Sequence, residues 1–227
     1  MKPIFVITTH QSEKYRPDGH NYTKRAVDSI KEHMKIDHDV IVIDNASNNI
    51  YPYEGVIKLY RETQPGGLIR TWNFGVNFGI ANGNDHFVLM NDDVYFNESI
   101  ASYFTVIGNH EYNKVAYYTA FCNNSTTFVD NRGKRQPGVI KDITGSREGP
   151  HGFFLSFGKD FFDNQHVNGV MFDEQRPFKG QEQLFHSRIV GNRGKCFVIG
   201  DCEIHHSHTG SWRQLYKDGV SLDSKHT

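Results

Sequence analysis

Two adjacent carboxylates follow an apolar run near the middle of the chain. The mostly apolar residues 86–90 have the composition of a buried strand, and Asp92 and Asp93 come shortly after it. Neighbouring carboxylates repel each other and are costly to bury unless a cation or a proton compensates them. Divalent metal ions accept such oxygen ligands and keep positions open for phosphate groups. The pair therefore predicts a site for a metal-bound phosphate ligand. The alternative is an ordinary turn, because Asp is a common turn residue.

Histidines gather near the end of the chain. Four of the thirteen fall in one stretch, as His186, His205, His206 and His208. On a strand His206 and His208 point to one side and His205 to the other, so the first two can face one ion. An imidazole nitrogen beside a carboxylate suits Mn²⁺ better than Mg²⁺. A zinc site made of His205, His206, His208 and a cysteine is the alternative.

The first half of the chain alternates predicted strands and helices. We expect strands over residues 2–9, 40–43, 56–60 and 86–90, and helices over residues 23–34 and 68–82. Thr23 is expected to cap the first helix and Gly83 to end the second. This order favours right-handed βαβ units. Open α/β sheets bind ligands at the carboxyl ends of their strands, where Thr8, Thr9 and Asp44 stand.

The second half is less regular. We expect helices over residues 100–110 and 181–190, and strands over residues 115–121, 153–157 and 196–199. Residues 123–149 are polar and rich in glycine and charge, which predicts a partly mobile loop. We expect this loop to complete ligand recognition by closing over a bound diphosphate.

Composition limits the classes of partner and compartment. The 227 residues carry 25 basic and 26 acidic side chains without a run of one sign, which argues against nucleic acid as a partner. The three cysteines are odd in number and lack metal-type spacing, which indicates reduced thiols in a cytosol-like compartment. The first apolar run is too short for a signal peptide or a membrane span, so we expect a soluble, cytoplasmic protein without a transmembrane segment.

An ordered set of short motifs runs through both halves of the chain. The motifs of the first half are Thr8-Thr9, Asp44-Asn45-Ala46-Ser47, Gly66-Gly67, Asn73-Phe74-Gly75, Gly79-Ile80-Ala81-Asn82-Gly83 and Leu89-Met90-Asn91-Asp92-Asp93. Those of the second half are Gly149-Pro150-His151-Gly152-Phe153-Phe154-Leu155, Phe172-Asp173-Glu174, Phe178-Lys179-Gly180-Gln181-Glu182-Gln183-Leu184, Arg188, His206 and Thr209-Gly210-Ser211. In this order, the two sets resemble the nucleotide-sugar half and the acceptor half of family 2-type glycosyltransferases with the GT-A fold. The resemblance implies one α/β domain over residues 1–227, with a mixed, mostly parallel central sheet flanked by helices. Its nucleotide-sugar half covers about residues 1–96 and its acceptor half about residues 97–227.

The resemblance also implies roles for individual residues. Those implied to contact the nucleotide-sugar donor are Thr8, Thr9, Asp44, Asn45, Gly67, Arg70 and Asp92. Asp93 would bind Mn²⁺ or Mg²⁺, with His206 and His208 as further ligands. Glu182 would be the general base, taking the proton from an acceptor hydroxyl while that oxygen attacks the anomeric carbon. The alternatives are that Asp44 starts a turn, that Arg70 lies on a solvated helix face, and that Glu182 favours a helix N-terminus.

Taken together, the sequence predicts a metal-dependent, inverting glycosyltransferase of the hexosyltransferase type. Its donor would be a UDP- or GDP-sugar, and its acceptor a hydroxyl of a glycan or other molecule. Asn91 and Gln183 stand where the family often has acidic residues, which leaves open a non-catalytic module that binds a nucleotide sugar or glycan. A nucleotidyltransferase using the same Asp pair is a further alternative, although the chain lacks a Walker-type phosphate loop.

Overall fold

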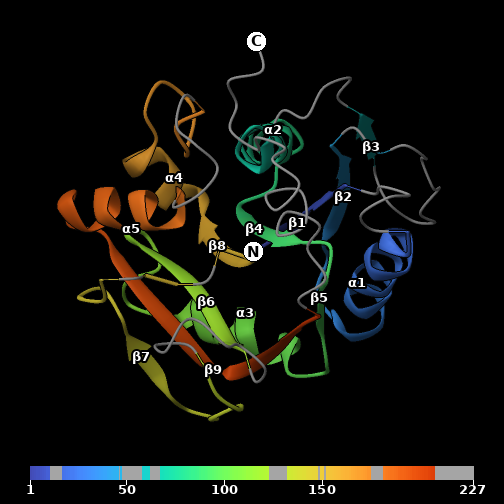
Figure 1. The fold of residues 1–227 in the computed structure, drawn as a ribbon. Helices are drawn as coiled ribbons and strands as arrows, with labels where there is room; N and C mark the ends of the chain where they lie inside the picture. Colours follow the sequence, from blue (N-terminus) through green and yellow to red (C-terminus); the bar gives the residue numbers. More distant parts are fainter. Residues whose placement is uncertain are drawn as a thin grey trace.

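The protein is built on a nine-stranded sheet with five helices in its described part (Figure 1). The computed structural model describes residues 1–10, 17–45, 47, 58–61, 67–122, 132–147, 149–150, 152–174 and 181–207. The strands are β1 (Pro3–Thr9), β2 (Asp39–Asp44), β3 (Lys58–Arg61), β4 (His86–Asn91), β5 (Val94–Phe96), β6 (Ala116–Cys122), β7 (Ile140–Asp142), β8 (Phe154–Gly158) and β9 (Lys195–His206). The helices are α1 (Gly19–His33), α2 (Gly67–Ala81), α3 (Ile100–Asn109), α4 (Lys159–Gln165) and α5 (Gln181–Gly191).

The strand order is β3-β2-β1-β4-β8-β6-β9-β5, and β7 pairs with β9 outside this order. The four strands of the first half, β3, β2, β1 and β4, are parallel. β8 lies antiparallel between β4 and β6, and β6 is parallel to β9. The prediction of an α/β fold with a mixed central sheet flanked by helices is therefore confirmed.

Helices cover both faces of the sheet. α1 and α3 share one core with Phe5 and Ile7 of β1, whereas α2, α4 and α5 share the other core with Ile4 and Val6. Successive strand residues point to opposite faces, so β1 is buried on both sides. This explains why the sequence of this strand is continuously apolar rather than alternating.

Two glycines let α2 lie close to β1. A Cβ atom on Gly75 would lie 2.2 Å from Cγ1 of Val6, and one on Gly79 would lie 2.7 Å from Cγ2 of Ile4. Gly83 follows the helix with a φ of 78°, which ends it as predicted, because glycine adopts this conformation without strain.

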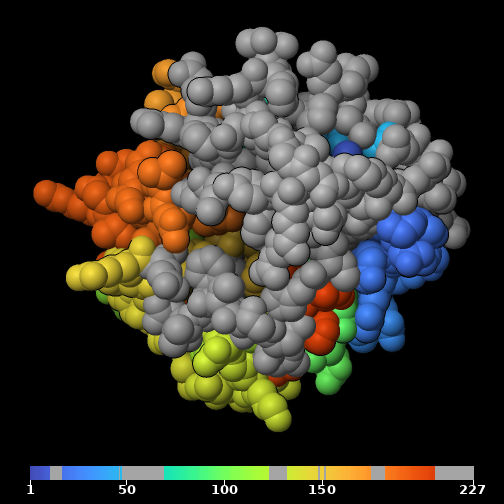
Figure 2. All heavy atoms as spheres, viewed as in Figure 1, coloured from blue at the N-terminus to red at the C-terminus, as the bar shows by residue number. Residues whose placement is uncertain are grey.

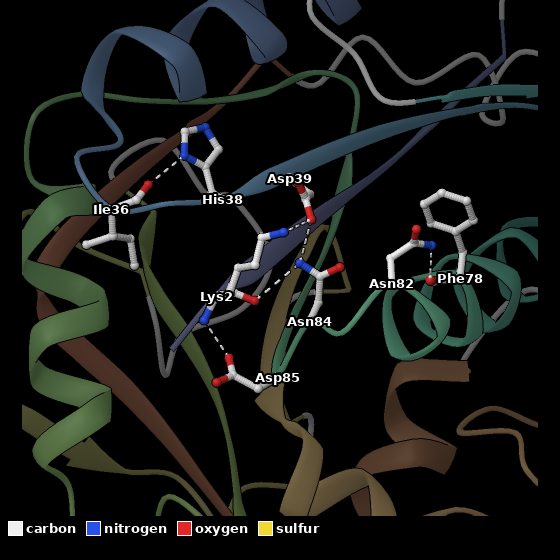
Figure 3. A network of polar contacts seen from close by, with 8 residues as sticks. All are labelled: Lys2, Ile36, His38, Asp39, Phe78, Asn82, Asn84 and Asp85. Carbon is white, nitrogen blue, oxygen red and sulfur yellow. Dashed lines mark hydrogen bonds and ion pairs between the residues drawn. The ribbon is translucent and has the colours of Figure 1, made fainter.

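A polar network closes the sheet at the amino ends of the parallel strands, the end opposite the carboxylate pair (Figure 3). The Lys2 ammonium lies 2.9 Å from Asp39 Oδ2, and Asn84 Nδ2 donates to the same oxygen at 2.8 Å. The backbone N–H of Lys2 donates to Asp85. Burial alone would raise the pKa of Asp39, but the hydrogen bonds from Lys2 and Asn84 outweigh it and lower the pKa. The network therefore ties the starts of β1, β2 and β4 together.

Several local predictions were wrong. Thr23 does not cap α1, because the helix begins at Gly19 and Thr23 lies in its second turn. Within the predicted loop, residues 140–142 form β7, whose exposed side chains give no periodic signal; residues 123–131 and 148 lie outside the described part. β9 extends well beyond the predicted strand at residues 196–199.

Among the described helices, none combines the length and the apolar composition that a membrane crossing needs.

Candidate active site

The two carboxylates occupy the turn between β4 and β5, and they point to different partners. Asp92 is buried, and its Oδ2 accepts hydrogen bonds from the hydroxyls of Thr9 at 2.6 Å and Thr23 at 3.0 Å. Thr9 ends β1 and Thr23 belongs to α1. Because a buried carboxylate needs donors, these hydroxyls stabilise Asp92 and link three elements of the fold. Thr23 was predicted only as a helix cap, and no motif indicated that it contributes to this site.

Asp93 faces β9 instead. Its Oδ1 lies 3.1 Å from Nε2 of His206, and both side chains are largely buried. Val94 pairs with His206 in the β5–β9 ladder, and the backbone N–H of Ser207 donates to the Asp93 carbonyl at 2.9 Å. The structure therefore brings together two of the three predicted metal ligands. The third, His208, lies outside the described residues.

The Asp93–His206 pair fits a divalent cation. Two ligands bound at 2.0–2.1 Å and at right angles would lie about 3 Å apart, close to the observed oxygen–nitrogen distance. A carboxylate oxygen and an imidazole nitrogen suit Mn²⁺. The described residues contain no group of three His, Cys, Asp or Glu side chains able to hold a metal. His205, a ligand of the alternative zinc site, lies against Tyr95 with ring centroids 4.5 Å apart.

The other predicted donor contacts lie at the carboxyl ends of β1 and β2. The Asp44 carboxylate is buried and accepts the backbone N–H of Ser47 at 2.9 Å, as the turn interpretation predicts. The Thr8 hydroxyl lies 2.8 Å from that of Thr71 in α2. Asn45 donates its N–H to the Thr9 carbonyl, and its own carbonyl lies 2.7 Å from Nδ1 of His10. His10 thus stands beside the predicted donor pocket, although no motif singled it out.

α2 carries two more of the predicted contacts. Gly67 is its first residue, and Arg70 projects into solvent with 55% of its side chain exposed. Arg70 Nε lies 3.8 Å from Glu174 Oε2, so part of its charge is already compensated. The amide of Asn73 donates to Glu174 and to the Phe172 carbonyl. Asn73 therefore fixes the chain around Phe172 against α2.

Glu182 lies in the first turn of α5, where the helix dipole favours a carboxylate. Burial raises the pKa of Glu182, and a hydrogen bond from its own backbone N–H offsets part of that rise. A Cβ atom on Gly152 would lie 2.0 Å from Glu182 Oε1, so the Gly152 backbone packs directly on the carboxyl group. A carboxylate whose pKa is raised binds a proton more strongly than an ordinary glutamate, which suits general-base chemistry.

One turn further along α5, His186 connects the helix to Ser146 and to Tyr117 of β6. Its Nε2 lies 2.9 Å from the Ser146 carbonyl and its Nδ1 2.5 Å from the Tyr117 hydroxyl. Nε2 therefore carries the proton, and Nδ1 accepts from tyrosine. His186 is thus a buried packing residue rather than a metal ligand.

In the space-filling view, the carboxyl end of β9 (red) reaches the surface on the same face as α5 (orange), between α1 (blue) and the segment around β5 (green) (Figure 2). The candidate base and the candidate cation pair thus come from elements that share one side of the molecule. Asp93 follows the carboxyl end of β4, and Gly152, which packs on Glu182, comes just before the start of β8 beside that same end, where open α/β sheets bind ligands.

This sheet, with a carboxylate turn after its fourth strand and a histidine on its last, defines a glycosyltransferase fold of the GT-A type. No protein-family model matches the chain, and no curated protein is significantly similar to it in sequence. Solved structures with the same fold include GalNAc-T7 with UDP, GalNAc and Mn²⁺ (13% identity, TM-score 0.63, covering 91% of this chain and 44% of that one). Two further examples are S. aureus TarS 1–349 with UDP-GlcNAc (16% identity, TM-score 0.63, covering 90% of this chain and 58% of that one) and S. aureus TarS (15%, 0.66, 95% and 38%). The chain thus spans 38 to 58% of the length of these three chains.

Proposed function

We propose that the chain is a metal-dependent glycosyltransferase of the family 2 type, which moves a hexose from a UDP-sugar to an acceptor hydroxyl with inversion. The observation that carries this proposal is the link between the two candidate halves of the site. Gly152 contacts Glu182, and the next residue, Phe153, contacts His206 of the Asp93–His206 pair. Two consecutive residues therefore contact the candidate general base and the candidate cation-binding pair. UDP is proposed because GalNAc-T7 and TarS structures contain it.

In this mechanism each residue has one task. Glu182 accepts the proton of the acceptor hydroxyl, whose oxygen attacks the anomeric carbon from the face opposite the leaving diphosphate. Asp93 and His206 would hold a divalent cation, Mn²⁺ in preference to Mg²⁺. When bound, the cation neutralises charge on the leaving diphosphate. Thr8, Thr9, Asp44, Asn45, Gly67 and Arg70 line the donor side of the site. For Asp92, two threonine hydroxyls compete with the proposed ribose contact.

Binding and turnover test the proposal separately. Calorimetry with UDP, GDP and their common sugar conjugates, each with and without Mn²⁺, is expected to show metal-dependent binding of a uridine nucleotide. Asp93→Asn should abolish that metal dependence. Preferential binding of GDP would indicate a GDP-sugar as the donor. Binding of neither UDP nor GDP would refute the proposal.

Glu182→Gln should lower donor consumption by 10²- to 10⁴-fold, the usual contribution of a general base, with donor affinity retained. Equal turnover by Glu182→Gln would exclude Glu182 as the base. Metal-dependent binding without any turnover would favour the non-catalytic binding module. Release of pyrophosphate rather than UDP would favour a nucleotidyltransferase. We also propose a reducing, cytosol-like location, which rests on the odd number and the spacing of the cysteines.

A further inference from the structure

The aromatic ring of Phe153 stacks on the His206 imidazole. The two ring centroids are 4.1 Å apart and the ring planes differ by 18°, so the rings are stacked. A histidine ring rotates broadly about its second side-chain torsion unless something packs on it. A stacked neighbour restricts that rotation while leaving the ring edge, with Nε2, directed at Asp93. The stack therefore selects the orientation in which His206 can share a cation with Asp93.

The backbone of Phe153 is itself tied to the strand that leads into the carboxylate turn. Its carbonyl accepts the N–H of Asn91 at 3.1 Å, and the following residue, Phe154, pairs with Met90 in the β4–β8 ladder. Phe153 and the turn that carries Asp93 are thus anchored to the same end of β4. Movement of one relative to the other requires breaking this pairing.

Gly152 sets the position of Glu182 in a comparable way. A Cβ atom at this position would lie 2.0 Å from Oε1, 2.1 Å from Cγ and 2.4 Å from Cδ of Glu182. The φ of Gly152 lies outside the left-handed range that side chains rarely adopt, so alanine is sterically allowed there except for this contact. The side chain that would have to move is the flexible end of Glu182. An added methyl group would therefore displace the candidate base rather than the fold.

We propose that the dipeptide Gly152-Phe153 is the positioning element of the active site, with Gly152 fixing the Glu182 carboxyl and Phe153 fixing the His206 imidazole against Asp93. This inference rests on the proposed function. It assigns to two uncharged residues the task of keeping the base and the cation-binding pair in register, because consecutive Cα atoms are held about 3.8 Å apart by the peptide bond.

Phe153→Leu tests the cation-binding side. Titration of UDP in the presence of Mn²⁺ is expected to show about three- to tenfold weaker binding than wild type, the loss expected from one aromatic pair. UDP without Mn²⁺ should bind both proteins equally. Phe154→Leu is the matched control, because Phe154 is fully buried and packs edge-on against Phe96 and Tyr103. It should lower thermal stability and keep the wild-type affinity for UDP and Mn²⁺.

Equal affinities of wild type and Phe153→Leu, or an equal loss in both variants, would overturn the role of Phe153. Imidazole NMR signals separate this outcome from failure of the proposed function. The ring current of Phe153 should shift the ring protons of His206, assigned with His206→Asn, and Phe153→Leu should remove that shift. Unchanged His206 signals would overturn the stack even if nucleotide binding is metal-dependent. Wild-type protein that binds UDP without any metal dependence would refute the proposed function and the positioning role together.

Gly152→Ala tests the base side. We expect stability close to wild type, unchanged affinity for UDP and Mn²⁺, and donor turnover about 100-fold lower, since a displacement of about 1 Å has this effect on aligned catalytic groups. Gly145→Ala is the control, because a Cβ atom there meets nothing within 4 Å. In a Glu182→Gln background, Gly152→Ala should cause no further loss. A full additional loss in that background, or wild-type turnover by Gly152→Ala, would overturn the role of Gly152.

Discussion

A buried histidine far from the carboxylate turn makes the stability of the fold depend on pH. His86 is 2% exposed, its ring packs edge-on against Phe104, and its Nε2 has no hydrogen-bond partner among the described residues. Burial lowers the pKa of His86 from 6.5 to about 4. Between these values the unfolded chain binds a proton that the folded chain does not. Its contribution to stability is therefore complete above pH 6.5 and is lost as the pH falls towards 4.

The size of the effect follows from the two pKa values of His86. Linkage gives a loss of roughly 2 kcal/mol in the free energy of unfolding between pH 7 and pH 5, and about 3 kcal/mol by pH 4. Because single domains are stable by only about 5–15 kcal/mol, the loss is large enough to measure. Other groups also titrate in this range, so the informative quantity is the difference between wild type and a variant.

Urea unfolding of wild type and His86→Phe at pH 7, 6 and 5 measures that difference. His86→Phe keeps an aromatic ring against Phe104 and removes the titrating group, so it should lose about 2 kcal/mol less than wild type between pH 7 and pH 5. His166→Asn, at an exposed histidine, should keep the wild-type dependence. Parallel stability curves for wild type and His86→Phe would refute the reasoning.

Three further predictions concern the packing of α2, the carboxylate turn and the candidate base. Gly75→Ala places a methyl group 2.2 Å from Cγ1 of Val6 and should destabilise the protein by about 1–3 kcal/mol in urea unfolding, with Val6→Ala restoring part of the loss; an unchanged midpoint would contradict the close packing. Thr23→Val removes a donor to Asp92 and should cost about 1–3 kcal/mol, whereas Thr23→Ser, which keeps the hydroxyl, should cost much less. A loss in Thr23→Ser as large as that in Thr23→Val would contradict a dominant contribution of the hydroxyl. Because burial raises the pKa of Glu182, kcat/KM should fall on the acid side at a pH above 4.5, the ordinary pKa of Glu; a limb at or below that pH would exclude Glu182.

The parts of the fold that were predictable are those specified by local pattern. Residues 4–7 and 87–90 are apolar without alternation, and both segments are central strands buried on two faces. The proximity of Asp93 to His206 could be predicted in general terms. Strand alternation places His206 on the opposite side from His205, and a buried carboxylate needs a compensating partner. The roles of these residues stay predictions.

What escaped prediction depends on contacts between distant parts of the chain. Thr23 matches a helix cap in isolation, and only the arrangement of α1 over the end of β1 brings it to Asp92, 69 residues away. β7 has three residues with no apolar face, so nothing but pairing with β9 specifies it as a strand. The proposed role of Gly152 likewise cannot be predicted from the sequence, because the absence of a side chain is informative only when the neighbouring group is known.

The two carboxylates of the turn differ in what neutralises them, and this bears on when a cation is needed. Asp92 is satisfied by two hydroxyls and Asp93 has an imidazole at 3.1 Å, so neither depends on a metal for burial. A structural metal site, by contrast, contributes its binding energy to folding. We therefore expect a chelator such as EDTA to leave the thermal midpoint of the protein unchanged while abolishing metal-dependent nucleotide binding. In His206→Ala, which removes the imidazole beside the buried Asp93 carboxylate, the midpoint should fall and Mn²⁺ should restore part of it. A large drop in the wild-type midpoint on chelation would show that the cation is part of the fold, and that Asp93 and His206 are not sufficient partners for each other.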